Sequence, residues 1–352
     1  MERKRSLRLA ALAAALGVLL TAAGSASGLS GAPDDGMSPE ARTYLTTALD
    51  LMEQHSVLRH QVDWAQLRRR ALDQAHGART AADTYGVIAS ALNSVHDGHS
   101  FFAAPKTAAA VFGAVELDPQ GLQGTSLDGD GIGYLVLRAV EGSAATLDGY
   151  VRRGRQAVAT ADRAGACGWI VDLRGDSGGA VRPMLAVLGP ILGDGPAGGM
   201  VDADGRRAAW SVEHGNGYED GRPIGWADSR PIARSVPPVA VLTGQHTASS
   251  GEAVVVAFHG RPGTRFFGEP TYGVPTGNNP FRLSDGAVLN LTTADDVDRT
   301  GRTYDAPIPP DEEVANDPAA AVGSDRDRVL AAARAWLHRQ PGCQGSQGSQ
   351  AG

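Results

Sequence analysis

The chain has 352 residues, of which 42% are hydrophobic and 20% are charged. This composition excludes a disordered protein and supplies enough apolar residues for one large or two modest globular domains. A formal net charge of -7 argues against nucleic acid or an anionic membrane surface as the main partner.

The first 30 residues have the features of a signal peptide. Residues 2–8 are basic, residues 9–23 are apolar but too few for a comfortable membrane span, and residues 24–27 are small enough for cleavage. We therefore expect a signal peptide at 1–30 and an exported mature protein with no stable membrane insertion. An uncleaved anchor is the alternative. Because no cysteine stands directly after the apolar stretch, the sequence argues against lipoprotein anchoring.

A helical N-terminal subdomain is expected over residues 37–102. Ser38 can cap a first helix with apolar residues at the helical period, and two further amphipathic stretches follow around 62–72 and 85–95. The subdomain ends at residues 96–102, where Asp97 and Gly98 break the helix and two aromatic residues begin a strand. A histidine at such a junction is usually a solvated loop residue, which is the simpler interpretation of His96 and His99.

An α/β pattern begins at Gly133 and belongs to a second domain expected over residues 105–315. Residues 134–137 and 169–173 predict buried strands, and residues 144–164 and 184–192 predict helices. The glycine-rich stretch 174–179 between them lets the backbone approach a ligand closely, but it lacks the lysine and the spacing of a phosphate-binding loop. Residues 193–231, rich in glycine and aromatic side chains, are expected to form an insertion or lid.

Ser249 and Ser250 lie on a predicted strand-to-helix turn. Residues 239–242 have the length and β-branching of a buried strand, and residues 252–258 favour a helix. A serine here either caps the helix or projects as a nucleophile beside unpaired helical N–H groups. The turn by itself does not decide between the two.

The rest of the chain is expected to complete the second domain. A strand at 265–269, a hairpin joining 281–283 to 287–291, and a closing segment at 307–311 precede a C-terminal helix within 316–341. Residues 342–352 are expected to be a disordered tail. The two cysteines, Cys167 and Cys343, fit neither a metal site nor a disulfide framework by spacing, so a disulfide and a free buried thiol at Cys167 both stay open. The sequence indicates no cofactor and no metal.

Three separated motifs resemble those of the C-terminal processing, or tail-specific, serine peptidases. They are Asp97-Gly98-His99-Ser100, the stretch 171–179, and Thr247-Ala248-Ser249-Ser250-Gly251-Glu252 followed by Gly268-Glu269-x-Thr271-x-Gly273. The similarity extends from about residue 40 to residue 315. It implies a fold of the α/β class. In this fold an α+β mixed sheet is flanked by helices, and the core is like those of ClpP and crotonase.

Two departures identify a branch of that family. Many members place a lysine base twenty-five residues after the serine, where this chain has Val274. Many also carry a PDZ domain after the first motif, for which the interval between Phe102 and Gly133 is too short, so no PDZ domain is expected. What remains resembles the lysine-free branch, which includes nisin-resistance proteases and the tricorn core peptidase.

The resemblance implies roles for particular residues. Ser249 matches the nucleophile and His99 matches a general base. For the oxyanion of an acyl-transfer reaction, the candidate donors are the backbone N–H groups of Gly178, Gly179 and Ser250. Asp305 and Asp97 are candidates for the residue that orients His99.

The sequence thus predicts an exported serine endopeptidase that uses a Ser-His dyad on peptides or proteins bound in extended form. One alternative is a catalytically inactive peptide-binding or envelope-binding protein of the same fold. Another is a dedicated antimicrobial-peptide resistance protease. The sequence gives neither the substrate nor the oligomeric state.

Overall fold

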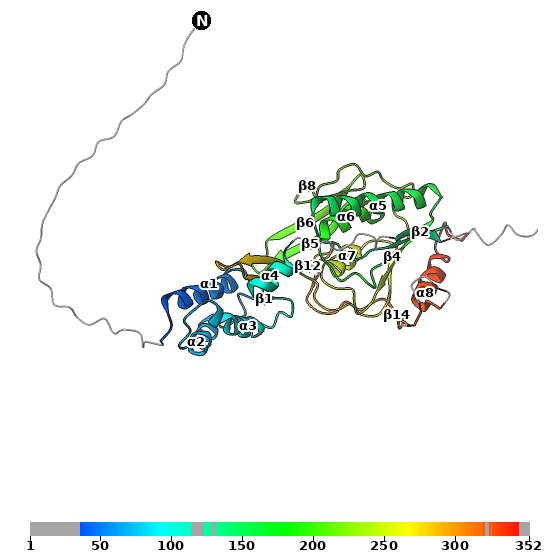
Figure 1. The fold of residues 1–352 in the computed structure, drawn as a ribbon. Helices are drawn as coiled ribbons and strands as arrows, with labels where there is room; N and C mark the ends of the chain where they lie inside the picture. The colour runs from blue at the N-terminus through cyan, green and yellow to red at the C-terminus, as the bar shows by residue number, and fades with distance from the viewer. Residues whose placement is uncertain are drawn as a thin grey trace, which may run out of the picture. The chain divides into compact units, whose positions relative to one another are not determined.

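The computed structural model describes residues 36–113, 123–127, 131–317, 319–320, 324 and 326–344 (Figure 1). The expected signal peptide lies outside these residues. The described chain forms two β-sheets with flanking helices, which confirms the predicted α/β class.

A six-stranded sheet forms the centre of the α/β part. Its strand order is β14-β10-β9-β4-β3-β2, and every neighbouring pair is parallel except β2 with β3. The strands are β2 (Gln123–Leu127), β3 (Ile132–Val136), β4 (Gly168–Asp172), β9 (Val239–Thr243), β10 (Thr264–Gly268) and β14 (Glu312–Glu313). The predicted strands at 134–137, 169–173, 239–242 and 265–269 are therefore confirmed within one or two residues.

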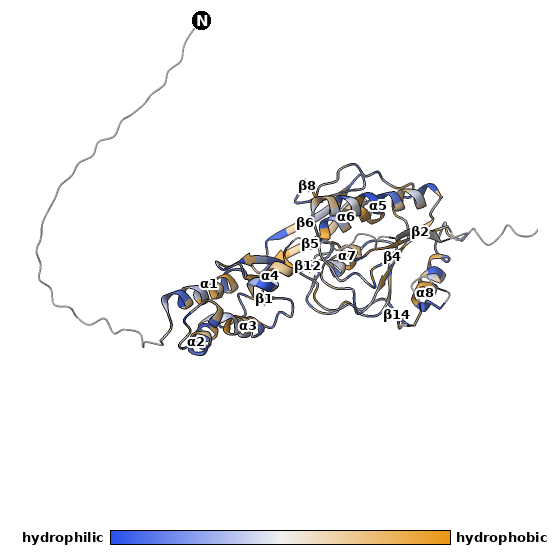
Figure 2. Ribbon diagram, in the orientation of Figure 1, coloured by the Kyte–Doolittle hydropathy of each residue, from blue (hydrophilic) through white to orange (hydrophobic). Residues whose placement is uncertain are grey.

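Helices cover both faces of this sheet. Successive side chains of a strand point to opposite faces, so Val171 and Val241 pack with α5 (Ala144–Arg163), α6 (Val181–Leu192) and α7 (Ser250–Phe258). Ile170 and Ala240 instead pack against α8 (Arg328–Leu337) on the other face. Figure 2 shows both hydrophilic and hydrophobic residues along α5, as expected for a helix with one buried side. Burial on both faces explains why these strands have continuous apolar sequences.

The second sheet is antiparallel. Its main path is β1-β12-β5-β6-β7-β8, with β11 and β13 also paired to β12. The strands are β1 (Phe101–Ala103), β5 (Gly195–Asp202), β6 (Arg207–Glu213), β7 (Asn216–Glu219), β8 (Arg222–Pro223), β11 (Thr276–Arg282), β12 (Val288–Val297) and β13 (Thr303–Tyr304). The segment 193–231 forms β5 to β8. It is built into the fold, because β5 pairs with β12 and Trp210 and Val212 lie in the main hydrophobic core.

Helices of the N-terminal part pack on the β11–β12 hairpin. They are α1 (Pro39–His55), α2 (Trp64–Gln74), the 3₁₀ turn η1 (Ala82–Thr84), α3 (Tyr85–Asn93) and the short α4 (Pro105–Val111). The side chain of Ser38 accepts a hydrogen bond from the Ala41 N–H, so it caps α1 as predicted. Leu289 and Leu291 of β12 complete the core of this part. His99 lies where this core meets the antiparallel sheet.

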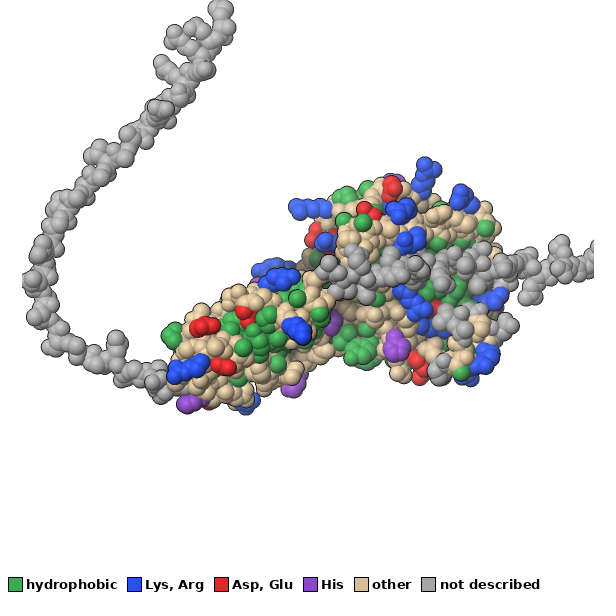
Figure 3. All heavy atoms as spheres, viewed as in Figure 1, with side chains coloured by type: hydrophobic (Ala, Val, Ile, Leu, Met, Phe, Trp, Pro, Cys, Tyr) green, Lys and Arg blue, Asp and Glu red, His purple; other side chains and the backbone are tan. Residues whose placement is uncertain are grey.

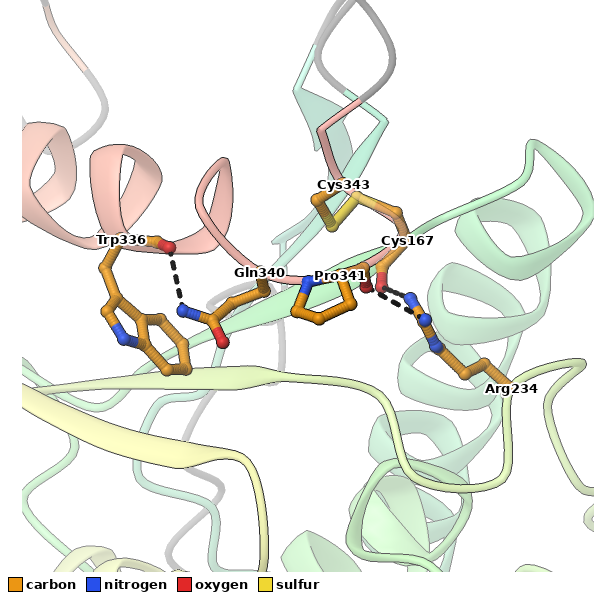
Figure 4. Close-up of a disulfide and its surroundings, with 6 residues drawn as sticks. All are labelled: Cys167, Arg234, Trp336, Gln340, Pro341 and Cys343. Atoms are coloured by element: carbon orange, nitrogen blue, oxygen red, sulfur yellow. Dashed lines mark hydrogen bonds between the residues drawn. A yellow bond between two sulfur atoms is a disulfide. The ribbon is translucent and has the colours of Figure 1, made fainter.

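A disulfide joins Cys167 to Cys343 and resolves the alternatives that the sequence leaves open. The two Cα atoms are 5.2 Å apart, and Arg234 donates one hydrogen bond to the Cys167 carbonyl and another to the Pro341 carbonyl (Figure 4). Cys343 is buried, so residues 342–344 are fixed to the start of β4. The expectation of a disordered tail from residue 342 is wrong for these residues, and 345–352 lie outside the described residues.

Lys and Arg side chains are scattered over the face shown in Figure 3 without forming one continuous patch. Among the described residues, no helix combines the length and the apolar character needed to cross a membrane.

Candidate active site

Ser249 occupies a strained position between β9 and α7. Its backbone has φ 52° and ψ -119°, a combination that is uncommon for a residue other than glycine and costs on the order of 1 to 3 kcal/mol. The turn before it is fixed by Thr247, whose buried hydroxyl donates to the Leu173 carbonyl at 2.8 Å. Ala248 N–H donates to the Asp176 carbonyl at 3.0 Å. These contacts hold the turn against the end of β4.

Glu252 stabilises the strained turn from inside the protein. Its carboxylate is fully buried and accepts hydrogen bonds from the Ser249, Gly273 and Val274 N–H groups at 2.8 to 2.9 Å, and one from the Thr271 hydroxyl. Burial raises the pKa of Glu252, and the four hydrogen bonds act in the opposite direction. One carboxylate therefore joins the serine turn to the segment 271–274.

The glycine-rich loop 174–179 lies directly against Ser249. A Cβ added to Gly178 would be 2.9 Å from the Ser249 Cβ, and the φ of Gly178 is 109°, so the position requires glycine. The N–H of Gly178 donates to Asp176 Oδ1 at 3.0 Å. Asp176 is fully buried, its Oδ2 has no partner, and burial raises its pKa to about 7.

Gly179 and Ser250 present backbone N–H groups beside the nucleophile candidate. The Gly178 carbonyl accepts from Val140 N–H at 3.3 Å. Because a trans peptide places C=O and N–H on opposite sides, the Gly179 N–H points away from Val140. Neither the Gly179 nor the Ser250 N–H has a hydrogen-bond acceptor in the described structure, and the Ser250 hydroxyl donates to the Gly179 carbonyl. Of the three predicted oxyanion donors, Gly179 and Ser250 thus keep free N–H groups, whereas Gly178 donates to a carboxylate.

Hydrogen bonds to Asp97 fix the turn that carries His99. Asp97 Oδ1 accepts from the His99 and Ser100 N–H groups at 3.1 and 2.7 Å, and Asp97 Oδ2 accepts from the Ser100 hydroxyl at 2.6 Å. Ser100 Oγ also accepts from the Thr292 N–H of β12 at 2.8 Å. Asn278 Nδ2 donates to the His99 carbonyl at 3.1 Å. The backbone of His99 is therefore fixed to both β11 and β12.

The ring of His99 contacts Thr276, a residue that sequence reasoning did not single out. His99 Nδ1 and Thr276 Oγ1 are 2.7 Å apart. The two candidates for orienting the ring make other contacts. Asp97 binds groups of its own turn, and Asp305 is exposed, its charge adding to burial in raising the pKa of Asp295. Burial lowers the pKa of His99, partly offset by the nearby Asp97 charge.

A cavity of about 1200 Å³ is lined both by the serine turn and by Thr276, the residue that contacts the His99 ring. Its wall includes Ser249, Ser250, Gly179 and Thr276. Much of the remaining wall comes from the segment 193–231, with Met200, Asp202, Asp204, Arg206, Arg207, Ala208, Glu219, Ile224 and Trp226. The cavity is larger than most small-molecule sites and suits a stretch of polypeptide.

Ser249 lines this cavity, and His99 contacts Thr276 in its wall; one short segment, 271–276, supports both residues. Residues 271–274 bind the carboxylate of Glu252, and Thr276 binds the His99 ring. No hydrogen bond joins Ser249 to His99 in the described structure. Within the same residues, no three His, Cys, Asp or Glu side chains gather in an arrangement that could hold a metal.

Of the two supporting residues, Glu252 can be predicted from the sequence and Thr276 cannot. Glu252 has a local signal, because Ser249-x-x-Glu252 has the spacing of a helix capping box. Thr276 has none, because its contact with His99 spans 177 positions. Only the folded register of β11 brings Thr276 to the ring.

The sequence comparisons agree with the fold. The model of Peptidase family S41 matches residues 131–314, more than half of the chain. The nisin-resistance protein of Lactococcus lactis subsp. lactis is 26% identical over 286 residues, covering 81% of this chain and 86% of that protein. The chloroplastic carboxyl-terminal-processing peptidase 2 of Arabidopsis thaliana is 29% identical over 215 residues, covering 57% of this chain and 38% of that protein.

A solved structure supports the same fold. The lipoprotein from Streptococcus agalactiae superposes with a TM-score of 0.68 at 23% identity, covering 85% of this chain and 96% of that one. The α/β fold is thus shared with that protein. The chain belongs to Peptidase family S41, which confirms the resemblance to the C-terminal processing peptidases.

Proposed function

We propose that this peptidase is a serine endopeptidase in which Ser249 is the nucleophile and His99 is the general base. The supporting observation is one cavity lined both by Ser249, whose strained turn is held by Glu252, and by Thr276, whose hydroxyl contacts the His99 ring. Strained backbone is stored preferentially at functional sites. The lowered pKa of His99 keeps its imidazole neutral at pH 7, as a base requires.

In the proposed reaction, Ser249 Oγ attacks the scissile carbonyl carbon while His99 Nε2 takes the hydroxyl proton. Collapse of the tetrahedral intermediate breaks the C–N bond, and His99 returns the proton to the leaving amine. A water molecule then attacks the acyl-enzyme, with His99 again taking a proton and giving it back to Ser249 Oγ. The products are a carboxylic acid and an amine, and the enzyme is regenerated.

The oxyanion of the intermediate is assigned to the N–H groups of Gly179 and Ser250. Both lack an acceptor in the described structure and both residues line the cavity beside Ser249. Removing one such donor costs on the order of 3 kcal/mol in other enzymes. Gly178 N–H contributes only if its hydrogen bond to Asp176 breaks.

The proposed substrates are peptides or proteins in extended form. Main-chain hydrogen bonds to strands at the cavity would hold them, with side-chain contacts from the segment 193–231. We place the enzyme outside the cytoplasm. That placement rests on the expected signal peptide, on the Cys167–Cys343 disulfide, and on similarity to a nisin-resistance protein and a lipoprotein.

A serine-reactive phosphonate probe tests the proposal directly. Wild type should be labelled on Ser249 and should hydrolyse peptides, whereas Ser249→Ala and His99→Ala should lose hydrolysis with little change in the thermal midpoint. Ser250→Ala is the matched control and should retain substantial activity. Labelling of Ser250, or an inactive Ser250→Ala beside an active Ser249→Ala, would move the nucleophile by one residue. No labelling at all would favour the inactive peptide-binding alternative.

A dedicated antimicrobial-peptide resistance protease is the second candidate. It is favoured by the nisin-resistance protein of Lactococcus lactis, which matches 81% of this chain and is itself covered to 86%. The two candidates share the chemistry and differ in substrate range. Hydrolysis of one antimicrobial peptide from a broad peptide panel would support the dedicated enzyme, and hydrolysis of many unrelated peptides would support general proteolysis.

A further inference from the structure

We propose that Thr276 is the positioning residue of the catalytic histidine, a role that a carboxylate fills in a Ser-His-Asp triad. This inference rests on the proposed function of His99 as the base. It starts from the 2.7 Å contact between His99 Nδ1 and Thr276 Oγ1.

In the proposed arrangement, the direction of this hydrogen bond decides which nitrogen of His99 acts as the base. A neutral imidazole carries its proton on only one nitrogen. If Nδ1–H donates to Thr276 Oγ1, the lone pair is left on Nε2, which is then free to take the proton of Ser249. The opposite tautomer would place a proton on Nε2 and remove the base. A threonine hydroxyl can accept or donate, and the proposal is that Thr276 Oγ1 accepts from Nδ1–H and so selects the active tautomer.

Thr276 is rigidly placed for this task. It is the first residue of β11, its N–H donates to the Val274 carbonyl at 2.8 Å, and it pairs across the sheet with Asp295 of β12. A β-branched side chain on a strand has few χ1 rotamers. The neighbouring Val274 N–H binds Glu252, so the same segment fixes the supports of both catalytic residues.

The alternative partners for the ring are already occupied or distant. Both oxygens of Asp97 bind atoms of their own turn. Asp295 lies opposite Thr276 and shares its side of the sheet, but no hydrogen bond joins Asp295 to His99 in the described structure. The hydroxyl of Thr276 is thus the group that contacts Nδ1.

The charge state of His99 depends on the same hydroxyl. Burial lowers the pKa of His99 and the Asp97 charge raises it, while Asp295 of β12 pairs with Thr276. An acceptor at Nδ1 stabilises the protonated ring, so removing the hydroxyl should lower the pKa of His99 further. The imidazolium also forms during the reaction, so the same loss should slow catalysis.

Thr276→Val tests this role, because valine keeps the shape and removes the hydroxyl. We expect kcat to fall on the order of tenfold or more with KM little changed, and the acid limb of the kcat/KM profile to move to lower pH. Thr276→Ser should restore most of the activity. Thr303→Val, the same change at an exposed position of β13, is the control and should behave as wild type.

Nitrogen-15 NMR of His99 supplies a readout that does not depend on activity. The wild type should show the neutral ring protonated at Nδ1, and Thr276→Val should show a shift toward the Nε2–H tautomer. A wild-type ring protonated mainly at Nε2 would overturn the proposal, and so would a Thr276→Val variant with unchanged tautomer and unchanged kcat. If His99→Ala stays active, the proposed function fails instead, whatever the NMR result.

Discussion

Asp176→Asn should make the protein more stable at alkaline pH and leave its stability at acid pH nearly unchanged relative to wild type. Asp176 is fully buried under α7, where a Cβ on Gly251 would be 2.5 Å from the Asp176 carbonyl oxygen. Burial raises the pKa of Asp176 from 3.8 to about 7, against the Gly178 hydrogen bond and the Arg138 charge, which lower it. The folded protein therefore holds a proton that the unfolded chain releases.

The sign and size of the effect follow from that difference in pKa. Between about pH 4 and pH 7 the folded state binds more protons than the unfolded state, so the contribution of Asp176 to stability declines as pH rises and is constant above about pH 7. Roughly three pKa units at about 1.4 kcal/mol each give a loss of about 4 kcal/mol. Asparagine keeps an oxygen that can accept from Gly178 N–H and does not titrate.

Urea unfolding at pH 4 and at pH 8 measures the effect. The free energy of unfolding of Asp176→Asn minus that of wild type should increase by about 4 kcal/mol between the two pH values. Because each protein is compared with itself at the two pH values, any pH-independent effect of the new amide on the free energy of unfolding cancels. Asp73→Asn, a change at an exposed aspartate of α2, is the control. A difference that stays constant from pH 4 to pH 8 would refute the assignment of a buried, protonated Asp176.

Four further outcomes are expected. Ser249→Gly should abolish hydrolysis yet raise the free energy of unfolding by about 1 kcal/mol, because glycine relieves the positive φ; no gain in urea denaturation would mean that the turn is not strained. The kcat/KM profile of wild type should rise with the deprotonation of one group below the ordinary histidine pKa of about 6.5 and should be unaffected by EDTA; control by a group near pH 9 would contradict a histidine base. Cys343→Ser should lower the free energy of unfolding by roughly 2 to 5 kcal/mol, and equal stability of the reduced and oxidised wild type would contradict this. Amidating the C-terminus of a cleaved peptide should change kcat/KM little, whereas a large loss would reveal a site that binds a terminal carboxylate.

Local patterns in the sequence determined much of the fold. Continuous apolar runs such as 169–173 predicted the central strands, because a strand covered on both faces needs apolar side chains in both directions. Helical periodicity predicted α1, α2, α3 and α5. The motifs around His99 and Ser249 likewise placed both residues on turns, where the structure has them.

Contacts between distant positions were decided only by the tertiary structure. The sequence offered Asp97 and Asp305 as partners of the His99 ring, and the folded chain places Thr276 there, 177 positions away. It also left the state of Cys167 open, which the approach of Cys343 settles. The physical reason is the same in each case. Periodicity and turn residues encode how a segment folds locally, but the register of β11 against β12 and the docking of α8 depend on packing the whole core, so the partner of a given atom cannot be obtained from its neighbours in the chain.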